Sequence, residues 1–473
     1  MNIFKKALCA GLVLTAAVLA LPLAASGASM QKVTVNTSYA YVYIPGEQDR
    51  GETLSAPYYT SLPAGTVDYM TDVASENIPD VGMQTYCFTT SGRKLLKSQV
   101  TLGEEVSSIP ANTITSVKVS ADSKSTKIVI GGNWNVPFNV MPDGITYSGS
   151  TNTVSSFSPS KVIVTMDYST LGTLSLPSSF PADSCFSGVT AKETTNGSVK
   201  QVVLTFSLKE SAYYGSYARW NSKGQLELEF LNPVDSLKGA RIFLDPGHGY
   251  NGSESEKDVG AVGSVLYEYQ LNYAKALALK EELEKRGATV MMLDTMNENY
   301  HLLSSRVEAA VEWQPHLYVS LHHDSTTNST SGGLTTYYNT PYSQPLAKNI
   351  QTALISAIRS ATGYQIQDRG YKFKEYAVTC SKCFPSILIE HGFISNPTEI
   401  GVMTDAHTLS VIASAEADAI EAFLLQKDMV ITPVPEPEDP VEPEPPVEDN
   451  RTDYEKLVDL AADHITSFSE SNP

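Results

Sequence analysis

Four side chains that can bind or work with a metal ion lie at the boundaries of predicted strands and helices in the second half of the chain. They are His248, Glu268, His322 and Glu390. In an open parallel sheet, functional groups lie just past the carboxyl ends of the strands, so we expect these four to converge at one sheet edge. Two histidines and one carboxylate, with a position left open for water, are typical of a catalytic zinc site. Structural zinc sites use four protein ligands and favour cysteine.

A zinc site of this kind can hydrolyse an amide, a bond that resists attack by neutral water. Zinc can lower the pKa of bound water from about 16 to roughly 7, and it polarises the substrate carbonyl. A nearby carboxylate takes the proton of the water and returns it to the leaving amine, and we expect Glu390 in this role. The alternative is a structural ion pair between Glu390 and Arg306 or Arg369. Either arginine could instead orient a group of the substrate.

The segment from Lys238 onward alternates predicted strands with predicted helices. Short apolar runs predict strands over 241–244, 289–293, 317–321, 333–338 and 386–389. Apolar residues at helical spacing predict helices over 268–286, 302–313, 346–358 and 409–424. Strands separated by helices imply a mostly parallel sheet with helices on both faces. The expected fold class is therefore multidomain, with this α/β catalytic domain preceded by an all-β region.

The stretch 241–427 resembles the zinc-dependent N-acetylmuramoyl-L-alanine amidases, a family of peptidoglycan hydrolases often called type 3 amidases. The matching motifs occur in the order of the family, and together they are far more specific than any one alone. They are Leu244-Asp245-Pro246-Gly247-His248-Gly249, Asp258-Val259-Gly260-Ala261 leading to Glu268, Ser320-Leu321-His322-His323-Asp324, Gly332-Gly333-Leu334-Thr335-Thr336-Tyr337-Tyr338, Arg369-Gly370 and Leu388-Ile389-Glu390-His391-Gly392-Phe393-Ile394-Ser395-Asn396.

The resemblance implies the reaction and the residues that carry it. Position by position, it makes His248, Glu268 and His322 the ligands of one Zn²⁺ per catalytic domain, and Glu390 the catalytic carboxylate. It also implies a peptidoglycan substrate, cut at the amide between the lactyl group of N-acetylmuramic acid and L-alanine of the stem peptide. Zinc chemistry alone equally permits a deacetylase or a peptidase acting on stem peptides. A non-catalytic wall-binding protein that keeps the fold is a further alternative.

Some positions around the expected ligands leave alternatives open. His323 stands where the family commonly has a small residue, and His391, next to Glu390, could compete as a ligand. Adjacent strand residues point to opposite faces, so only one of His322 and His323 should reach the metal, and the spacing from Ser320 favours His322. The glycines beside His248 let the main chain turn sharply and leave room for a substrate. The loop 251–257, richer in acid and serine, either acts as a lid or is simply solvated.

The region 29–236 is rich in Ser, Thr, Val and Tyr and shows no helical period. Short β-branched and aromatic runs between turn residues predict strands, so the region is expected to be all-β. Its length suggests two modules, 29–105 and 106–236. The second is expected to be similar to the AMIN-like modules that target amidases to the wall, although it carries no motif specific to them. Its tyrosines either bind glycan or pack in the core.

The N-terminal residues 1–28 have the pattern of a secretory signal peptide. Lys5 and Lys6 precede an apolar run, and small residues ending at Ala28 follow it. The apolar run is shorter than the roughly 20 residues needed to span hydrocarbon. We therefore expect a secreted, cell-wall-associated protein with no transmembrane segment after signal cleavage. At the other end, 428–450 is a Pro/Glu-rich linker, and 451–473 is a tail that could form one helix.

The composition excludes several other classes of function. The chain has 33 Lys+Arg against 52 Asp+Glu, a formal net charge of −19, so it is poorly suited to bind nucleic acid. Five cysteines in 473 residues are too few for a disulfide framework. Cys380 and Cys383 form either a local disulfide or two free thiols, and Cys87 could pair with Cys185. The sequence leaves the oligomeric state open.

Overall fold

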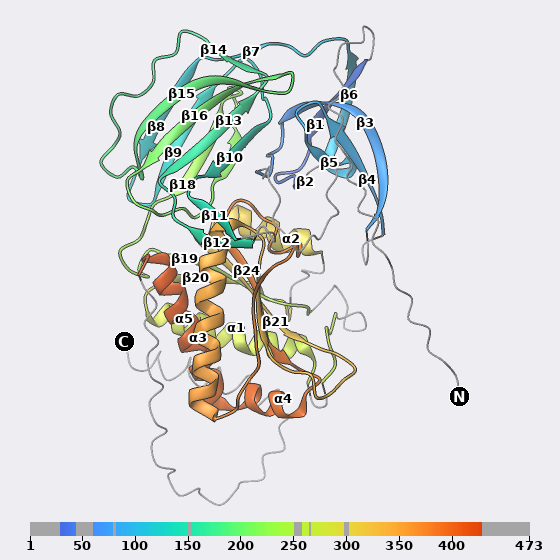
Figure 1. The fold of residues 1–473 in the computed structure, drawn as a ribbon, viewed down its shortest axis with the longest axis vertical. Coiled ribbons are helices and arrows are strands. Elements are labelled where there is room, and N and C mark those ends of the chain that lie inside the picture. The colour runs from blue at the N-terminus through green and yellow to red at the C-terminus, as the bar shows by residue number, and fades with distance from the viewer. Residues whose placement is uncertain are drawn as a thin grey trace, which may run out of the picture.

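The computed structural model describes residues 29–43, 60–78, 82–148, 153–249, 258–263, 266–297 and 302–427. Figure 1 shows two β units above an α/β domain. The expected signal peptide, the loop 251–257, the linker and the tail lie outside the described residues. Within the described ranges, no helix is both long enough and apolar enough to cross a membrane.

The first β unit is a single antiparallel sheet with the strand order β2-β5-β4-β3-β1-β6. Its strands are β1 (Met30–Val35), β2 (Val42–Tyr43), β3 (Val67–Ile78), β4 (Gly82–Thr89), β5 (Lys94–Leu96) and β6 (Val100–Val106). Val33 and Val35 of β1 are buried while Thr34 between them is half-buried. This alternation places one face of the sheet on an apolar core.

The second β unit is a sandwich of two four-stranded antiparallel sheets. The sheet orders are β10-β13-β16-β15 and β17-β18-β9-β8, and the short pairs β11-β12 and β14-β7 complete the unit. Its strands are β7 (Asn112–Ile114), β8 (Ser116–Ala121), β9 (Ser125–Gly131), β10 (Phe138–Pro142), β11 (Ile145–Ser148), β12 (Thr153–Phe157), β13 (Lys161–Asp167), β14 (Ser169–Leu171), β15 (Phe186–Asn196), β16 (Val199–Leu208), β17 (Tyr217–Trp220) and β18 (Leu226–Leu231). Ile128 and Leu228 from one sheet and Val164 and Leu204 from the other lie in one core.

The two β units are joined by a shared core and a buried ion pair. Apolar residues of both units belong to one cluster. Arg93 of the first unit pairs with Asp167 of the second, with side chains only 1% and 3% exposed. Arg93 also donates to the Phe138 carbonyl at 2.9 Å, and the Tyr168 hydroxyl donates to Asp68 at 2.7 Å. The two β units therefore pack against each other as one body.

The α/β domain is built on a six-stranded sheet with the order β20-β19-β21-β24-β22-β23. Its elements are β19 (Arg241–Pro246), α1 (Glu268–Lys285), β20 (Thr289–Met292), α2 (Leu303–Trp313), β21 (Leu317–Asp324), β22 (Leu334–Tyr338), α3 (Gln344–Thr362), β23 (Asp368–Phe373), β24 (Ser386–Phe393), α4 (Pro397–Thr404) and α5 (Ala406–Leu424). All neighbouring pairs are parallel except β22 with β24. The expected fold class is confirmed.

Helices cover both faces of this sheet. Leu244, Val319 and Ile389 face the layer of α1, α3 and α5, which Figure 1 shows together on one side of the domain. Phe243 and Tyr318 face the opposite layer, which includes α2. Because successive strand residues alternate between the layers, each strand end presents one side chain to each face.

Two elements of this domain are absent from the expectations based on sequence. Strand β23 has one buried residue, Phe373, and lies at the sheet edge, so it lacks the apolar alternation that marks a half-buried strand. Helix α4 has eight residues and begins after Asn396, whose side chain accepts hydrogen bonds from Thr398 N and Glu399 N. A helix this short carries little periodic signal.

Candidate metal centre

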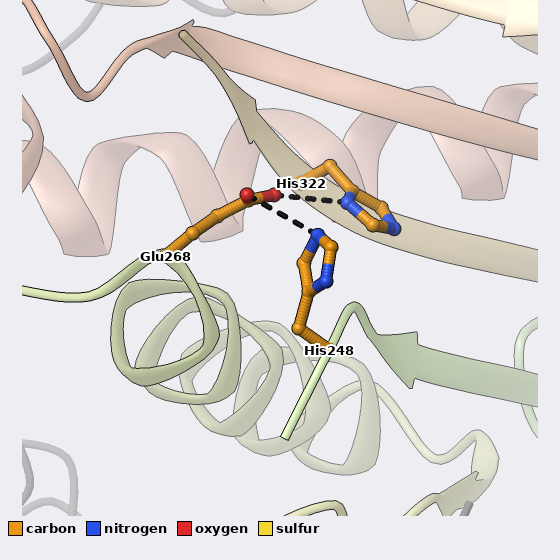
Figure 2. A group of neighbouring side chains, drawn as sticks. All are labelled: His248, Glu268 and His322. Carbon is orange, nitrogen blue, oxygen red and sulfur yellow. Dashed lines mark hydrogen bonds and ion pairs between the residues drawn. The ribbon is translucent and has the colours of Figure 1, made fainter. Parts of the chain in front are cut away.

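Three of the four residues singled out by the sequence meet at the carboxyl edge of the sheet. The ligand atoms of His248, Glu268 and His322 lie within 4.8 Å of one another. Figure 2 shows the Glu268 carboxylate reaching both imidazoles: Oε1 lies 2.9 Å from His322 Nδ1, and Oε2 lies 3.2 Å from His248 Nε2. The side chain of Glu268 is 5% exposed, whereas those of His248 and His322 are 25% and 18% exposed. The centre therefore opens to solvent on its histidine side.

Arg306 of α2 holds the segment that carries His248. Its guanidinium donates to the carbonyls of His248 at 2.7 Å and Pro246 at 2.9 Å, and it pairs with the buried Asp245. The main chain at His248 is left-handed, with φ +65°, which is uncommon for a residue other than glycine. The contacts of Arg306 support this conformation. Arg306 is thus the partner of Asp245, not of Glu390.

Two glycines leave the space that the side chains of the candidate ligands occupy. A Cβ atom on Gly247 would lie 2.2 Å from the His322 ring, and one on Gly260 would lie 2.6 Å from both Glu268 Oε2 and the His248 ring. These distances are far inside van der Waals contact, so any side chain at either position would displace a candidate ligand. The expectation that the glycines beside His248 leave room for a substrate is wrong for Gly247, because the His322 ring fills that space.

Glu268 is the first residue of α1, so its carboxylate lies at the positive end of the helix dipole. Its Oε2 also accepts a hydrogen bond from Ala261 N at 2.8 Å. Burial would raise the pKa of Glu268, but the hydrogen bonds to His248 and His322 outweigh burial and hold the pKa well below its ordinary value. The side chain therefore stays ionised and ready to bind a cation.

His322 and His323 point to opposite faces of the sheet, as strand alternation requires. His323 is 2% exposed and faces the other layer, where its Nδ1 lies 2.7 Å from Asn272 Oδ1. Its ring stacks on that of His391 with centroids 5.3 Å apart, and His391 Nε2 lies 2.7 Å from Glu416 Oε1. His323 and His391 are therefore occupied away from the centre, and neither competes with His322 or Glu390.

Glu390 lies beside the centre without bonding to it. In the parallel pairing of β21 with β24 it is the register partner of His322, so the two side chains share a face. Burial raises the pKa of Glu390 well above its ordinary value, and the charges of Glu268 and Asp324 raise it further. Its Oε2 is buried and has no hydrogen-bond partner among the described residues. Among the described residues Glu390 therefore forms no structural ion pair.

Asp258 belongs to the site although the sequence assigned it no role. Its Oδ2 lies 2.9 Å from His248 Nδ1, and its main chain exchanges two hydrogen bonds with Gly249. Burial alone would lower the pKa of His248, but hydrogen bonds to Asp258 and Glu268 raise it to about 10. Metal-binding histidines commonly place their second ring nitrogen on a carboxylate. An acid ten residues after His248, inside a family motif, was the signal that could have found it.

The remaining candidates have structural contacts. Arg369 Nε donates to the Gly332 carbonyl at 2.7 Å, and the guanidinium lies over the Phe393 ring at 4.6 Å. Within the described part of the chain, disulfide bonds join none of the cysteines Cys87, Cys185, Cys380 and Cys383. No disulfide is therefore formed by either pair that the spacing suggested.

The donor set fits a zinc ion. Two imidazoles and one carboxylate are the ligands of many catalytic zinc sites, and the exposed histidine side leaves space for water and substrate. The ionised Glu268 supplies the negative charge that a divalent cation requires. Across the described ranges, this is the one group of three or more His, Cys, Asp or Glu side chains placed to share an ion.

An α/β domain with such a donor set at its strand ends, and a second glutamate beside it, has the layout of a metal-dependent hydrolase. Residues 242–422 match the family model described as N-acetylmuramoyl-L-alanine amidase. The chain belongs to this family. The family and the enzyme class expected from the sequence are thus confirmed.

The chain is also similar to relatives of known sequence or structure, over different shares of its length. The amidase LytC of Bacillus subtilis is 27% identical over 331 residues, which cover 66% of this chain and 62% of LytC. The uncharacterized protein YqiI of the same organism is 30% identical over 194 residues, covering 40% of this chain and 87% of YqiI. The catalytic domain of the amidase CwlV from Bacillus (Paenibacillus) polymyxa is 28% identical, with a TM-score of 0.35, covering 39% of this chain and 98% of that domain.

Replacement of Arg306 by methionine is expected to lower the free energy of unfolding by about 3 kcal/mol, because Asp245 loses a buried ionic partner. The same change should weaken metal binding, since the segment that carries His248 loses two of its hydrogen bonds. Thermal denaturation and metal titration measure the two effects. Arg219→Met, which removes an exposed ion pair with Glu227, is the matched control and should change neither. Equal effects of both substitutions would contradict the role given to Arg306.

Proposed function

We propose that the chain is a secreted, zinc-dependent, autolysin-like hydrolase that cleaves the amide between N-acetylmuramic acid and L-alanine in peptidoglycan. The observation that carries the proposal is the convergence of His248, Glu268 and His322 at one sheet edge, with Glu390 in register beside His322. The family match over residues 242–422 supports the same reaction. The name of LytC, an N-acetylmuramoyl-L-alanine amidase, agrees with it.

The residues divide between holding the metal and moving a proton. His248, Glu268 and His322 would hold zinc, which when bound polarises the substrate carbonyl and makes water more acidic. Asp258 accepts a hydrogen bond from His248 Nδ1 and would so leave Nε2 directed at the ion. Glu390 accepts a proton from water at a carboxylate oxygen and delivers it to the nitrogen of the leaving L-alanine.

Export and retention at the wall are parts of the same proposal. The signal-peptide pattern of residues 1–28 supports export. A polymer outside the cytoplasm is the substrate that an exported amidase of this family would meet. The β units that precede the catalytic domain would hold the enzyme on that polymer.

Analysis of the products tests the proposed reaction. The full-length protein with zinc is expected to release peptides with new L-alanine N-termini from purified sacculi and to leave glycan strands free of peptide. A chelator should abolish this release, and added zinc should restore it, because the metal supplies the acidity of the water. Products whose muramic acid still carries peptide would indicate a peptidase instead. An intact wall after incubation would indicate a binding protein.

Sedimentation with purified sacculi tests the wall-binding part of the proposal. A fragment of residues 29–236, which contains both β units and their shared core, is expected to appear in the pellet. Buried tyrosines such as Tyr86, Tyr168 and Tyr213 are packed in the structure, so any glycan contact must come from other side chains. A fragment that stays in the supernatant would argue against wall binding by this region.

A further inference from the structure

A second group of side chains gathers on the same face of the sheet as Glu390. Tyr337 of β22 and Tyr376, which follows β23, meet edge to face with ring centroids 5.1 Å apart. The Lys374 ammonium lies 4.9 Å from the centre of the Tyr376 ring and 5.8 Å from that of the Tyr337 ring. All three residues are half-buried, so they are packed yet reach the surface. These residues are named the Lys374 cluster below.

The Lys374 cluster lies within electrostatic range of Glu390. The antiparallel register of β22 with β24 puts Tyr337 and Glu390 on one face of the sheet. Burial raises the pKa of Tyr337 to about 12, with smaller increases from the charges of Tyr376, Glu390 and Asp324, while the charge of Lys374 opposes them. The charge of Lys374 also acts on Glu390. A ligand on Lys374 would therefore lie close to the group that transfers the proton.

Lys374 differs from the other cations near the centre in its partners. Arg306 pairs with Asp245, and Arg369 is bound to the Gly332 carbonyl. In the part of the chain that the structure describes, Lys374 forms no ion pair with a carboxylate, and its ammonium rests on aromatic faces alone. An ammonium held on ring faces is partly desolvated and fixed in position, which strengthens its attraction for an anion.

The chemistry of the substrate identifies the group that this cation would take. In the bond proposed for cleavage, the carboxyl of muramic acid is already consumed in the amide, and N-acetylated sugars carry no charge. The negative charges of the substrate therefore lie on its peptide. Asp324, on the strand next to Glu390, repels such a charge, so Lys374 is the favourable partner nearby. We propose that the Lys374 cluster is a subsite for a carboxylate of an acidic peptide, an inference that rests on the proposed function.

The first β unit braces the loop that carries this subsite. The Tyr41 hydroxyl donates to Glu375 Oε1 at 3.2 Å, and the Tyr39 hydroxyl donates to the Cys380 carbonyl at 3.3 Å. Both tyrosines lie just before β2, so the β unit contacts the loop on either side of Tyr376. A loop held in place before the ligand arrives loses less conformational entropy on binding.

Two muramoyl peptides test the subsite. They differ only in whether the acidic residue after L-alanine carries a free carboxylate or an amide. Equilibrium binding of each is measured to the full-length, zinc-loaded Glu390→Gln protein, which is not expected to cut them. We expect about tenfold tighter binding of the free carboxylate, as for a hydrogen bond to a charged group. In the Glu390→Gln protein, the further substitution Lys374→Met should abolish the preference for the free carboxylate. Lys374→Arg, which keeps the charge, should retain most of that preference.

The control and the outcomes separate this inference from the proposed reaction. Lys348→Met removes the same charge from an exposed position of α3, on the other side of the sheet, and should leave the preference intact. Equal or absent binding of the two peptides, or a preference that survives Lys374→Met, overturns the inference. Release of L-alanine N-termini is measured independently with Glu390 intact. Carboxylate binding through Lys374 without such release would refute the reaction and keep the subsite.

Discussion

Replacement of Glu390 by glutamine is expected to slow amide hydrolysis by about 10²–10⁴-fold while zinc remains bound. The amide cannot accept a proton from water, so the step assigned to this side chain is lost. Zinc should be retained, because Glu390 makes no hydrogen bond to His248, Glu268 or His322 in the described structure. Burial raises the pKa of Glu390, so an uncharged amide of the same shape should fit this position without destabilising the fold.

Three measurements on the same preparation check this expectation. They are the rate of release of L-alanine N-termini, the zinc content of the purified protein and the thermal denaturation temperature. Glu308→Gln, the same change at an exposed position of α2, is the matched control and should behave like the parent. A Glu390→Gln protein that digests sacculi at the parental rate would show that another group transfers the proton.

Replacement of His322 by alanine is expected to lower zinc affinity by more than about 100-fold and to abolish hydrolysis with it. Loss of a residue that merely orients a ligand typically costs 10–100-fold in affinity, and loss of a ligand should cost more. Glu268 would also lose the imidazole that lies 2.9 Å from its Oε1. Competition titration with a zinc chelator measures the affinity.

His323→Ala provides the sharper comparison, because the two histidines are adjacent in sequence and face opposite layers. This substitution should reduce stability, since the ring stacks on His391 and contacts Asn272. It should nevertheless leave one zinc ion per protein. His407→Ala, at an exposed position of α5, should change neither property. Loss of zinc from the His323 variant with retention in the His322 variant would reverse the ligand assignment.

The main elements of the α/β domain follow from local sequence patterns. The stripe of Leu346, Ile350, Leu354 and Ile358 predicts α3, and all four residues are buried in the structure. The apolar run 317–321 predicts the centre of β21. Strand β23 and helix α4 were missed because one lies at a sheet edge with little burial and the other is too short to show a period. Both form because neighbouring elements supply their hydrogen bonds and packing.

The candidate site, like the fold, could be predicted only in part from the sequence. Residue types and family motifs singled out His248, Glu268, His322 and Glu390, and the structure brings the first three within reach of one ion. The contact of Asp258 with His248 and the hydrogen bond from Arg306 to the His248 carbonyl were not predicted. The Arg306 contact joins segments 58 residues apart with no local pattern between them, whereas Asp258 lies in a family motif but its residue type alone gave it no role.

The sequence by itself determined which side chains are available, in which order they occur and which local structures carry them, because periodic burial and turn chemistry act over a few residues. Tertiary structure decided which of these side chains meet. The ring of His322 rather than that of His323 reaches Glu268 because the register of β21 and the packing of α1 set its direction across 54 residues of chain. The contact of Tyr41 with Glu375 spans 334 residues. Such contacts depend on how whole layers pack, and no local pattern encodes that arrangement.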